Sequence, residues 1–147
     1  PMRTARALVL AAILALSGAG PAQTLVEVTT VTAIASQMFP AMSFPPSTLR
    51  AMGSGTEAVI ARVPDAATWT GWEVYTATGF AASLEPAFVY DIERGLLVEG
   101  FFRESTTTRE VGVERHTRVV FTDATQQALL YLIRNGRELV WLVARNR

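Results

Sequence analysis

The chain has 147 residues, and its 13 arginines balance 13 acidic residues, so its formal net charge is zero at pH 7. It has no cysteine, which excludes disulfides, thiol nucleophiles and cysteine-ligated metals, and no lysine, which excludes Schiff-base chemistry. The length fits one domain, and the charge gives no basic footprint for nucleic acid, so we expect no nucleic-acid partner.

The first 22 residues have the pattern of a secretory signal peptide. Arg3 and Arg6 form a basic start, residues 7–16 form an apolar run, and small residues with one proline follow. We predict cleavage after Ala22, which leaves residues 23–147 as a single exported β-rich domain, secreted or periplasmic. The apolar run is shorter than the roughly 20 residues of a membrane span, so we expect no stable span after removal of the signal. The alternative is a buried N-terminal helix.

The next part of the chain predicts two strands separated by irregular structure. Residues 25–34 are rich in Val, Thr and Ile, and residues 71–80 alternate between two faces, so both segments favour strands. Residues 39–46 hold three prolines and are expected to be irregular. Ser47 is a suitable cap for a short helix over residues 48–52.

Residues 87–92 and 96–103 flank the tripeptide Glu93-Arg94-Gly95 and predict a β-hairpin. Glycine supplies the left-handed conformation that a three-residue hairpin loop requires. The register of this hairpin places three cross-strand pairs on one mostly apolar face: Ile92–Leu96, Tyr90–Val98 and Phe88–Gly100.

Residues 57–63 and 109–121 predict two further strands. In the second strand, Arg115 and Thr117 interrupt an apolar face, and an inward arginine needs a carboxylate or a ligand anion. The opposite face has charged side chains typical of a solvated surface: Glu110, Glu114, His116 and Arg118. We therefore interpret His116, the single histidine of the sequence, as a surface residue rather than a general base.

The C-terminal segment has two interpretations. In the first, Asn135-Gly136 forms a type I′ turn between two strands, with Arg134 opposite Arg137. In the second, Asp123 caps a helix over residues 124–134 that ends before the glycine. We favour the hairpin, because a series of strands precedes it. The fold class predicted for the whole domain is mainly β, an antiparallel meander forming a small barrel or sandwich, with an α+β fold as the alternative.

The sequence indicates function only weakly. Our first hypothesis is that the domain binds a small apolar or amphipathic ligand in its interior, with an arginine as polar anchor and aromatic side chains as the wall: Arg115, Trp72, Phe88, Tyr90 and Trp141. The alternative is a periplasmic structural or protein-interaction module with a filled core, which contacts a protein partner through a sheet edge or its charged face. We expect no cofactor and no metal, and an enzyme is not favoured because nucleophile and phosphate-binding motifs are missing.

Overall fold

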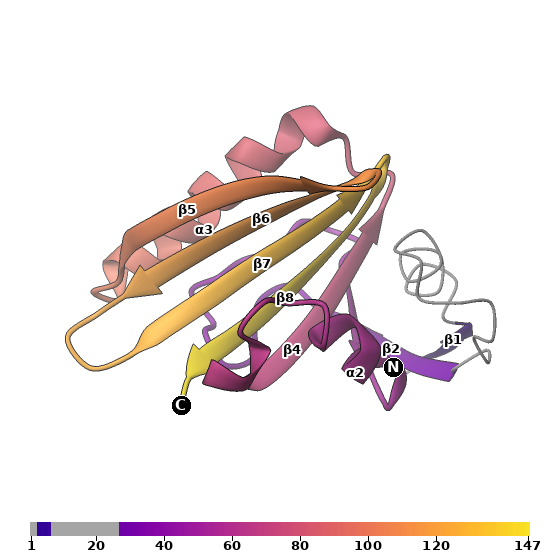
Figure 1. The fold of residues 1–147 in the computed structure, drawn as a ribbon, viewed down its shortest axis with the longest axis horizontal. Coiled ribbons are helices and arrows are strands. Elements are labelled where there is room, and N and C mark those ends of the chain that lie inside the picture. The colour runs from indigo at the N-terminus through magenta and orange to yellow at the C-terminus, as the bar shows by residue number, and fades with distance from the viewer. Residues whose placement is uncertain (1–2, 7–26) are drawn as a thin grey trace.

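The computed structural model describes residues 3–6 and 27–147, which form a twisted antiparallel sheet with helices on both faces (Figure 1). The strands are β1 (Arg3–Arg6), β2 (Glu27–Thr32), β3 (Leu49–Met52), β4 (Trp69–Thr78), β5 (Phe102–Val111), β6 (Glu114–Thr122), β7 (Gln127–Asn135) and β8 (Glu138–Asn146). The α-helices are α2 (Gly55–Ile60) and α3 (Glu85–Val98), and short 3-10 helices cover Ala66–Thr68 and Ala82–Leu84.

The strand order is β1-β2-β3-β4-β8-β7-β6-β5, so the sheet is open and β5 forms one of its edges. The prediction of a mainly β, antiparallel fold is confirmed, and the sheet does not close into a barrel. The helix proposed as the alternative for residues 124–134 is wrong, because this segment lies in β7 and the turn before it.

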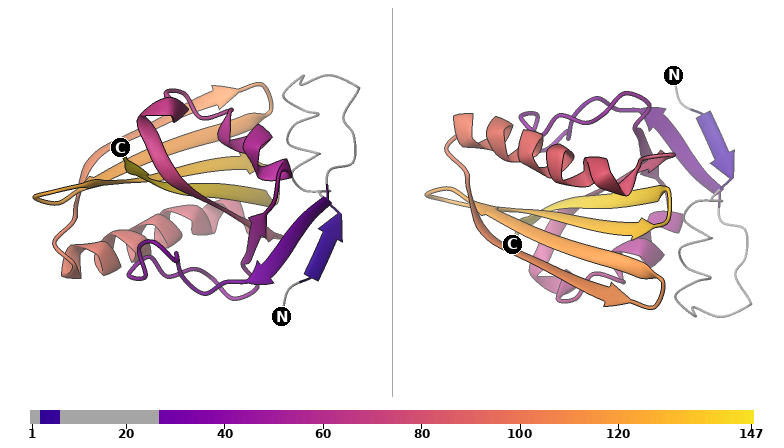
Figure 2. Two further views of the ribbon diagram at one scale, coloured as in Figure 1. Left: turned by 90° about the horizontal axis from the view of Figure 1, so that it is seen from below. Right: turned by 90° about the horizontal axis from the view of Figure 1, so that it is seen from above.

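The sheet separates two layers of covering structure (Figure 2). Helix α3 and the segment 33–48 pack on one face, and α2 with the turns after it packs on the other. Both faces of the central strands are therefore buried. This explains why β7 and β8 are apolar at almost every position. Such strands do not show the alternation of apolar and polar residues that marks a half-buried strand.

Helix α3 occupies the segment for which the sequence predicted a hairpin, so that prediction is wrong. The residues that α3 buries are Phe88, Ile92 and Leu96, which are spaced by four and face the sheet. A spacing of four also places residues on one face of a strand, so the same apolar positions fit both structures. A proline in the first turn, where the missing N–H costs nothing, favours the helix.

Gly95 has a different role from the one predicted. It is a helical residue rather than a turn residue, and α3 passes so close to segment 33–48 that a Cβ at this position would lie 2.0 Å from the carbonyl oxygen of Ala41. Glycine is thus required here for close approach of two backbones.

Before β4, the structure has a strand where the sequence predicted a short helix, and a helix where it predicted a strand. Residues 49–52 form β3 rather than a helix, because they pair with β2 on one side and β4 on the other. Residues 55–60 form α2 rather than a strand, and the buried residues Val59 and Val63 are again four apart. The predicted strands at 25–34 and 71–80 are confirmed by β2 and β4.

The segment 33–48 is fixed to β4 by a buried carboxylate. Glu73 accepts hydrogen bonds from Ser36 Oγ (2.7 Å), the Tyr75 hydroxyl (2.8 Å) and the backbone N–H of Met38 (2.8 Å). Burial and the hydrogen bond to Glu73 raise the pKa of Tyr75, so its hydroxyl stays protonated and donates a hydrogen bond to Glu73. Three donors on one buried carboxylate hold the segment over the α3 face of the sheet.

The long strand predicted over residues 109–121 is a hairpin. β5 and β6 are joined at Gly112-Val113, and Gly112 has a φ of +63°. The predicted division of β6 into two faces is nevertheless correct, because Arg115 and Thr117 lie on the face that bears Val119 and Phe121 in the α3-side core.

The C-terminal hairpin is confirmed, but its turn differs from the predicted one. Asn135 pairs with Glu138, so the two central turn residues are Gly136 and Arg137. Gly136 has a φ of +61°. Arg137 does not have a positive φ, because the non-glycine residues that do, among those described, are Ser47 and Asp65. A left-handed residue at the first central position alone is the pattern of a type II′ turn. The register therefore moves by two residues, which separates Arg134 from Arg137 and leaves every side chain on its predicted face.

Strand β1 falls within the predicted signal peptide, and the rest of that peptide lies outside the described residues. β1 pairs with β2, so removal of residues 1–22 would leave β2 as the edge of the sheet. Among the described residues, no helix is both long and apolar enough to cross a membrane.

Candidate functional site

A groove lies between α3 and the hairpin formed by β5 and β6, and we call it the α3 groove. Its volume is about 410 Å³, within the range of small-molecule sites. One wall comes from α3 and is mostly apolar: Glu85, Pro86, Val89 and Tyr90. The other wall comes from β5 and β6 and is polar: Arg103, Thr106, Thr108, Arg115 and Thr117.

The polar wall centres on Arg115 of β6. Its Nε donates a hydrogen bond of 3.1 Å to Glu110 Oε1, and within the described residues its two terminal amino groups have no hydrogen-bond partner. The hydroxyls of Thr108 and Thr117 lie 3.4 Å apart beside it. The side chain of Arg115 is 55% exposed, so its guanidinium remains solvated and can reach an anionic group.

The second arginine of the groove is fully engaged. Arg103 donates two hydrogen bonds of 2.9 and 2.8 Å to the carboxylate of Glu93 and a third of 3.2 Å to Thr106. This paired contact joins β5 to α3 and closes one end of the groove. Arg103 therefore positions the walls, and Arg115 is the cation with free donors.

The apolar wall is formed by the outer side of α3. Tyr90 is 55% exposed, and the guanidinium of Arg94 lies 5.8 Å from the centroid of its ring. Val89 and Pro86 continue the wall toward the start of the helix. An exposed aromatic ring beside aliphatic carbons offers a contact surface to an apolar ligand group.

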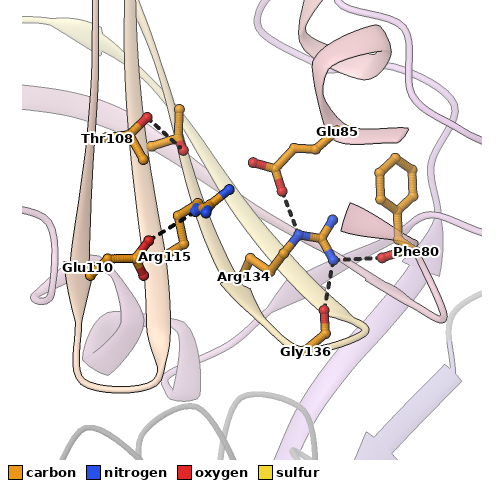
Figure 3. A network of polar contacts seen from close by, with 8 residues as sticks. Phe80, Glu85, Thr108, Glu110, Arg115, Arg134 and Gly136 are labelled. Atoms are coloured by element: carbon orange, nitrogen blue, oxygen red, sulfur yellow. Dashed lines mark hydrogen bonds and ion pairs between the residues drawn. The ribbon is translucent and has the colours of Figure 1, made fainter. Parts of the chain in front are cut away.

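A buried arginine fixes the start of α3 at the floor of the groove (Figure 3). Arg134 Nε donates to Glu85 Oε1 at 2.6 Å, and its Nη1 donates to the carbonyl oxygens of Phe80 (2.6 Å) and Gly136 (2.9 Å). Figure 3 shows Arg115 on the neighbouring strand, with its terminal nitrogens on the side facing Glu85. Arg134 engages Oε1 of Glu85, and among the described residues no hydrogen bond joins Glu85 to Arg115.

The five residues predicted to line an interior site do not meet in one place. Arg115 and Tyr90 lie on opposite walls of the α3 groove. Phe88 and Trp141 belong to the filled core on the α3 side, where their ring centroids are 4.9 Å apart and Trp141 is fully buried. Trp72 packs against the core on the other face of the sheet.

The prediction that His116 is a surface residue is wrong. His116 is 2% exposed, and its Nε2 lies 3.0 Å from Glu114 Oε1 while its Nδ1 lies 2.7 Å from the Tyr131 hydroxyl. Arg62, from the turn after α2, covers the pair and contacts Glu114. Burial lowers the pKa of His116, although the hydrogen bond that His116 donates to Glu114 acts in the opposite direction.

The sequence held no direct sign of this buried cluster. Strand β6 presents Glu114 and His116 on one face, as predicted, but the cover comes from residues 61–65, far away in sequence. Among the described residues, no three His, Cys, Asp or Glu side chains are grouped closely enough to hold a metal ion.

Comparison with known proteins identifies no relative: no family model matches the chain, and no curated protein or solved structure is significantly similar to it.

Proposed function

We propose that this chain is a binding protein for a small amphipathic ligand that carries an acid group, and that the ligand lies in the α3 groove. The observation that carries this proposal is the position of Arg115, whose free terminal donors lie across the groove from α3, where Val89 and Tyr90 form an apolar wall next to Glu85. A planar guanidinium with two free amino groups matches the geometry of a carboxylate or phosphate group. The apolar part of the ligand would lie along Val89 and Tyr90.

The packing of the domain supports a groove rather than an interior site. The space between the sheet and α3 is filled by a cluster of contacting rings, with Phe44 5.3 Å from Trp141 and 4.5 Å from Tyr75 between centroids. An interior ligand would have to displace these rings, whereas the groove is already open to solvent. Export, as predicted from the N-terminal sequence, would place the groove in contact with extracellular or periplasmic solutes.

The test is an NMR titration of the ¹⁵N-labelled chain with octanoate and, separately, with octanol. We expect octanoate to shift the amide signals of the groove strands saturably, and octanol to bind at least about tenfold more weakly because it cannot pair with a guanidinium. Arg115→Gln should reduce octanoate affinity by a similar factor and bring it close to that of octanol.

The matched control is Arg137→Gln, which removes an exposed arginine from the turn between β7 and β8, outside the α3 groove. It should leave octanoate binding unchanged. Equal affinity for octanoate in the Arg115→Gln protein and the unmodified protein would refute the proposed site. Amide signals of the groove that drift linearly with octanoate, without saturation, would refute the proposed function itself.

A protein-interaction module is the second candidate, and the exposure of β5 favours it. β5 is an edge strand of ten residues, and nine of them are exposed. An exposed edge strand can pair with a strand from another protein. Concentration-dependent association that is abolished by a proline at Thr107, with octanoate binding intact, would support this candidate alone.

A further inference from the structure

A second pocket lies on the opposite face of the sheet from the α3 groove, and we call it the His116 pocket. Its volume is about 380 Å³, and residues from four separate segments line it: Pro64, Asp65, Thr107, Arg109, His116, Arg118 and Tyr131. In the β5–β6 pairing, Thr107 is opposite Arg118 and Arg109 is opposite His116, so these four residues form its floor.

The floor of the His116 pocket contains a chain of buried hydrogen bonds. A carboxylate can only accept, so the 3.0 Å contact with Glu114 requires that His116 Nε2 carries a hydrogen. When the imidazole is neutral, its Nδ1 is then an acceptor, and the Tyr131 hydroxyl 2.7 Å away must donate to it. The proton of Tyr131 thus points into the protein and away from the pocket.

Protonation of His116 reverses the last hydrogen bond in this chain. Nδ1 then carries a hydrogen and donates to the Tyr131 oxygen, so the hydroxyl hydrogen becomes free to turn toward the pocket. When His116 is neutral, the Tyr131 hydroxyl therefore presents its oxygen to the pocket as an acceptor. When His116 is protonated, the same hydroxyl can donate a hydrogen bond into the pocket. An anion in the pocket favours the second state.

The charge around the pocket also favours an anion. Arg109 reaches the Tyr131 hydroxyl at a long 3.4 Å, and within the described residues it makes no other hydrogen bond through its side chain. Arg118 is held by two hydrogen bonds of 2.8 and 3.1 Å to Asp65, a residue in the left-handed conformation at φ +56°. The charged and titratable groups that face His116 are three arginines, two carboxylates and one phenol: Arg62, Arg109, Arg118, Glu114, Asp65 and Tyr131.

We propose that the His116 pocket binds a small oxyanion and takes up a proton at His116 as it does so. Arg109 supplies the main ionic contact, and the hydroxyls of Tyr131 and Thr107 complete the donor set. Arg118 pairs with Asp65, whereas Arg109 has no carboxylate partner among the described residues, and the anion neutralises its charge. Neutralisation also removes the repulsion that Arg62 and Arg109 exert on a protonated imidazole, so anion and proton stabilise each other.

The single histidine of the chain makes this inference directly testable. We would label the full chain, without an affinity tag, with ¹³C-histidine and follow the imidazole signal while sulfate replaces chloride at constant ionic strength. Sulfate is the probe because it stays fully ionised over the pH range in which histidine titrates. We expect a saturable shift of the signal and a higher apparent pKa of His116 in sulfate than in chloride.

Two variants of β5 locate the effect. Arg109→Gln should weaken sulfate binding about tenfold or more and abolish the change in pKa, whereas Arg103→Gln on the other face of the same strand should change neither. Tyr131→Phe should preserve part of the binding but lower its dependence on pH, because the hydroxyl that connects anion and imidazole is gone. Near-UV circular dichroism would show that each variant keeps its fold.

The outcomes are distinct. A signal that drifts linearly with sulfate, or that shifts equally in the Arg109→Gln protein, would overturn the proposed site. Saturable sulfate binding with an unchanged pKa of His116 would overturn the proton coupling. Parallel titrations with phosphate and acetate decide the ligand class: stronger binding of phosphate indicates a phosphate-bearing ligand, and stronger binding of acetate indicates a carboxylate.

Discussion

Gly95→Ala is expected to destabilise the domain, although the same change in most helices is stabilising. Replacing a mid-helix glycine by alanine normally gains about 1 kcal/mol, because alanine restricts the unfolded chain and favours the helix. In α3 the added Cβ would lie 2.0 Å from the carbonyl oxygen of Ala41 and 3.1 Å from its carbonyl carbon. Ordinary contact at such a position begins at 3.4 Å, so the two backbones must separate by more than 1 Å.

The size of the effect follows from the balance of these two contributions. Overpacking a rigid interface costs about 1–3 kcal/mol, and a clash with backbone rather than with a flexible side chain belongs at the upper end. Subtracting the gain in helix propensity of about 1 kcal/mol leaves a net loss of about 2 kcal/mol in the free energy of unfolding. Separation of α3 from segment 33–48 also loosens the packing around Met42, which is fully buried beside the helix.

The assay is urea denaturation followed by tryptophan fluorescence, with Ala87→Gly as the matched control. Ala87 is exposed on the same helix, so the reverse change there measures helix propensity alone and should cost about 1 kcal/mol. If Gly95→Ala is as stable as the unmodified chain or more stable, while Ala87→Gly shows the usual loss, the close approach of α3 to Ala41 is wrong.

Three further predictions concern the turn, the buried carboxylate and the buried histidine. Gly136→Ala should cost about 1–2 kcal/mol in urea denaturation because φ is positive there, whereas Asn135→Ala should be nearly neutral; a large loss at Asn135 would restore the type I′ turn. Glu73→Gln should lower the free energy of unfolding by about 2 kcal/mol in the same assay, because an amide nitrogen would face donors whose hydrogen bonds the carboxylate now accepts; an unchanged midpoint would contradict the buried network. Burial lowers the pKa of His116 in the folded state below its ordinary 6.5, so the unfolded chain binds that proton more tightly. The free energy of unfolding should therefore be highest above pH 6.5. Below pH 6.5 it should decrease by at most about 1.4 kcal/mol per pH unit, and His116→Gln should remove this decrease between pH 6.5 and 5.

The elements that could be predicted from sequence are those whose local pattern has one interpretation. β2 and β4 combine β-branched residues with alternation, and the C-terminal hairpin is marked by its glycine turn. α3 could not be distinguished from a hairpin, because Phe88, Ile92 and Leu96 satisfy both periods and Gly95 is compatible with a turn. The choice depends on Ala41, a residue more than 50 positions away, whose carbonyl leaves no room for a side chain.

The candidate sites depend even more on contacts between distant segments. Arg115 was predicted as a polar anchor because it interrupts an apolar face, and that face does line the α3 groove. Tyr90 lies on the same groove, although it comes from a helix and not from the predicted strand. The burial of His116 depends on Arg62, which was predicted to lie in a strand over residues 57–63, and on the turn at Asp65 that follows it. A charged strand face is typical of solvent until the segment that covers it is known.

The two pockets share the β5–β6 hairpin, and alternation along β6 assigns its side chains to them. Arg115 and Thr117 face the α3 groove, whereas His116 and Arg118 face the other pocket. Partly exposed ion pairs join the hairpin to the layer on each face, Arg103 with Glu93 on one side and Arg118 with Asp65 on the other. On the second side, Glu114 of β6 also forms a buried ion pair with Arg62.

Exposed ion pairs contribute about 0–1 kcal/mol each, and β5 adds few buried apolar contacts because nearly all of its residues are exposed. β5 is therefore held mainly by its pairing with β6, and we expect it to open at a lower free energy than the buried strands β7 and β8. In the proposed complex, a ligand that contacts both Val89 on α3 and Arg115 on β6 would join the two walls of the groove and stabilise this edge of the sheet.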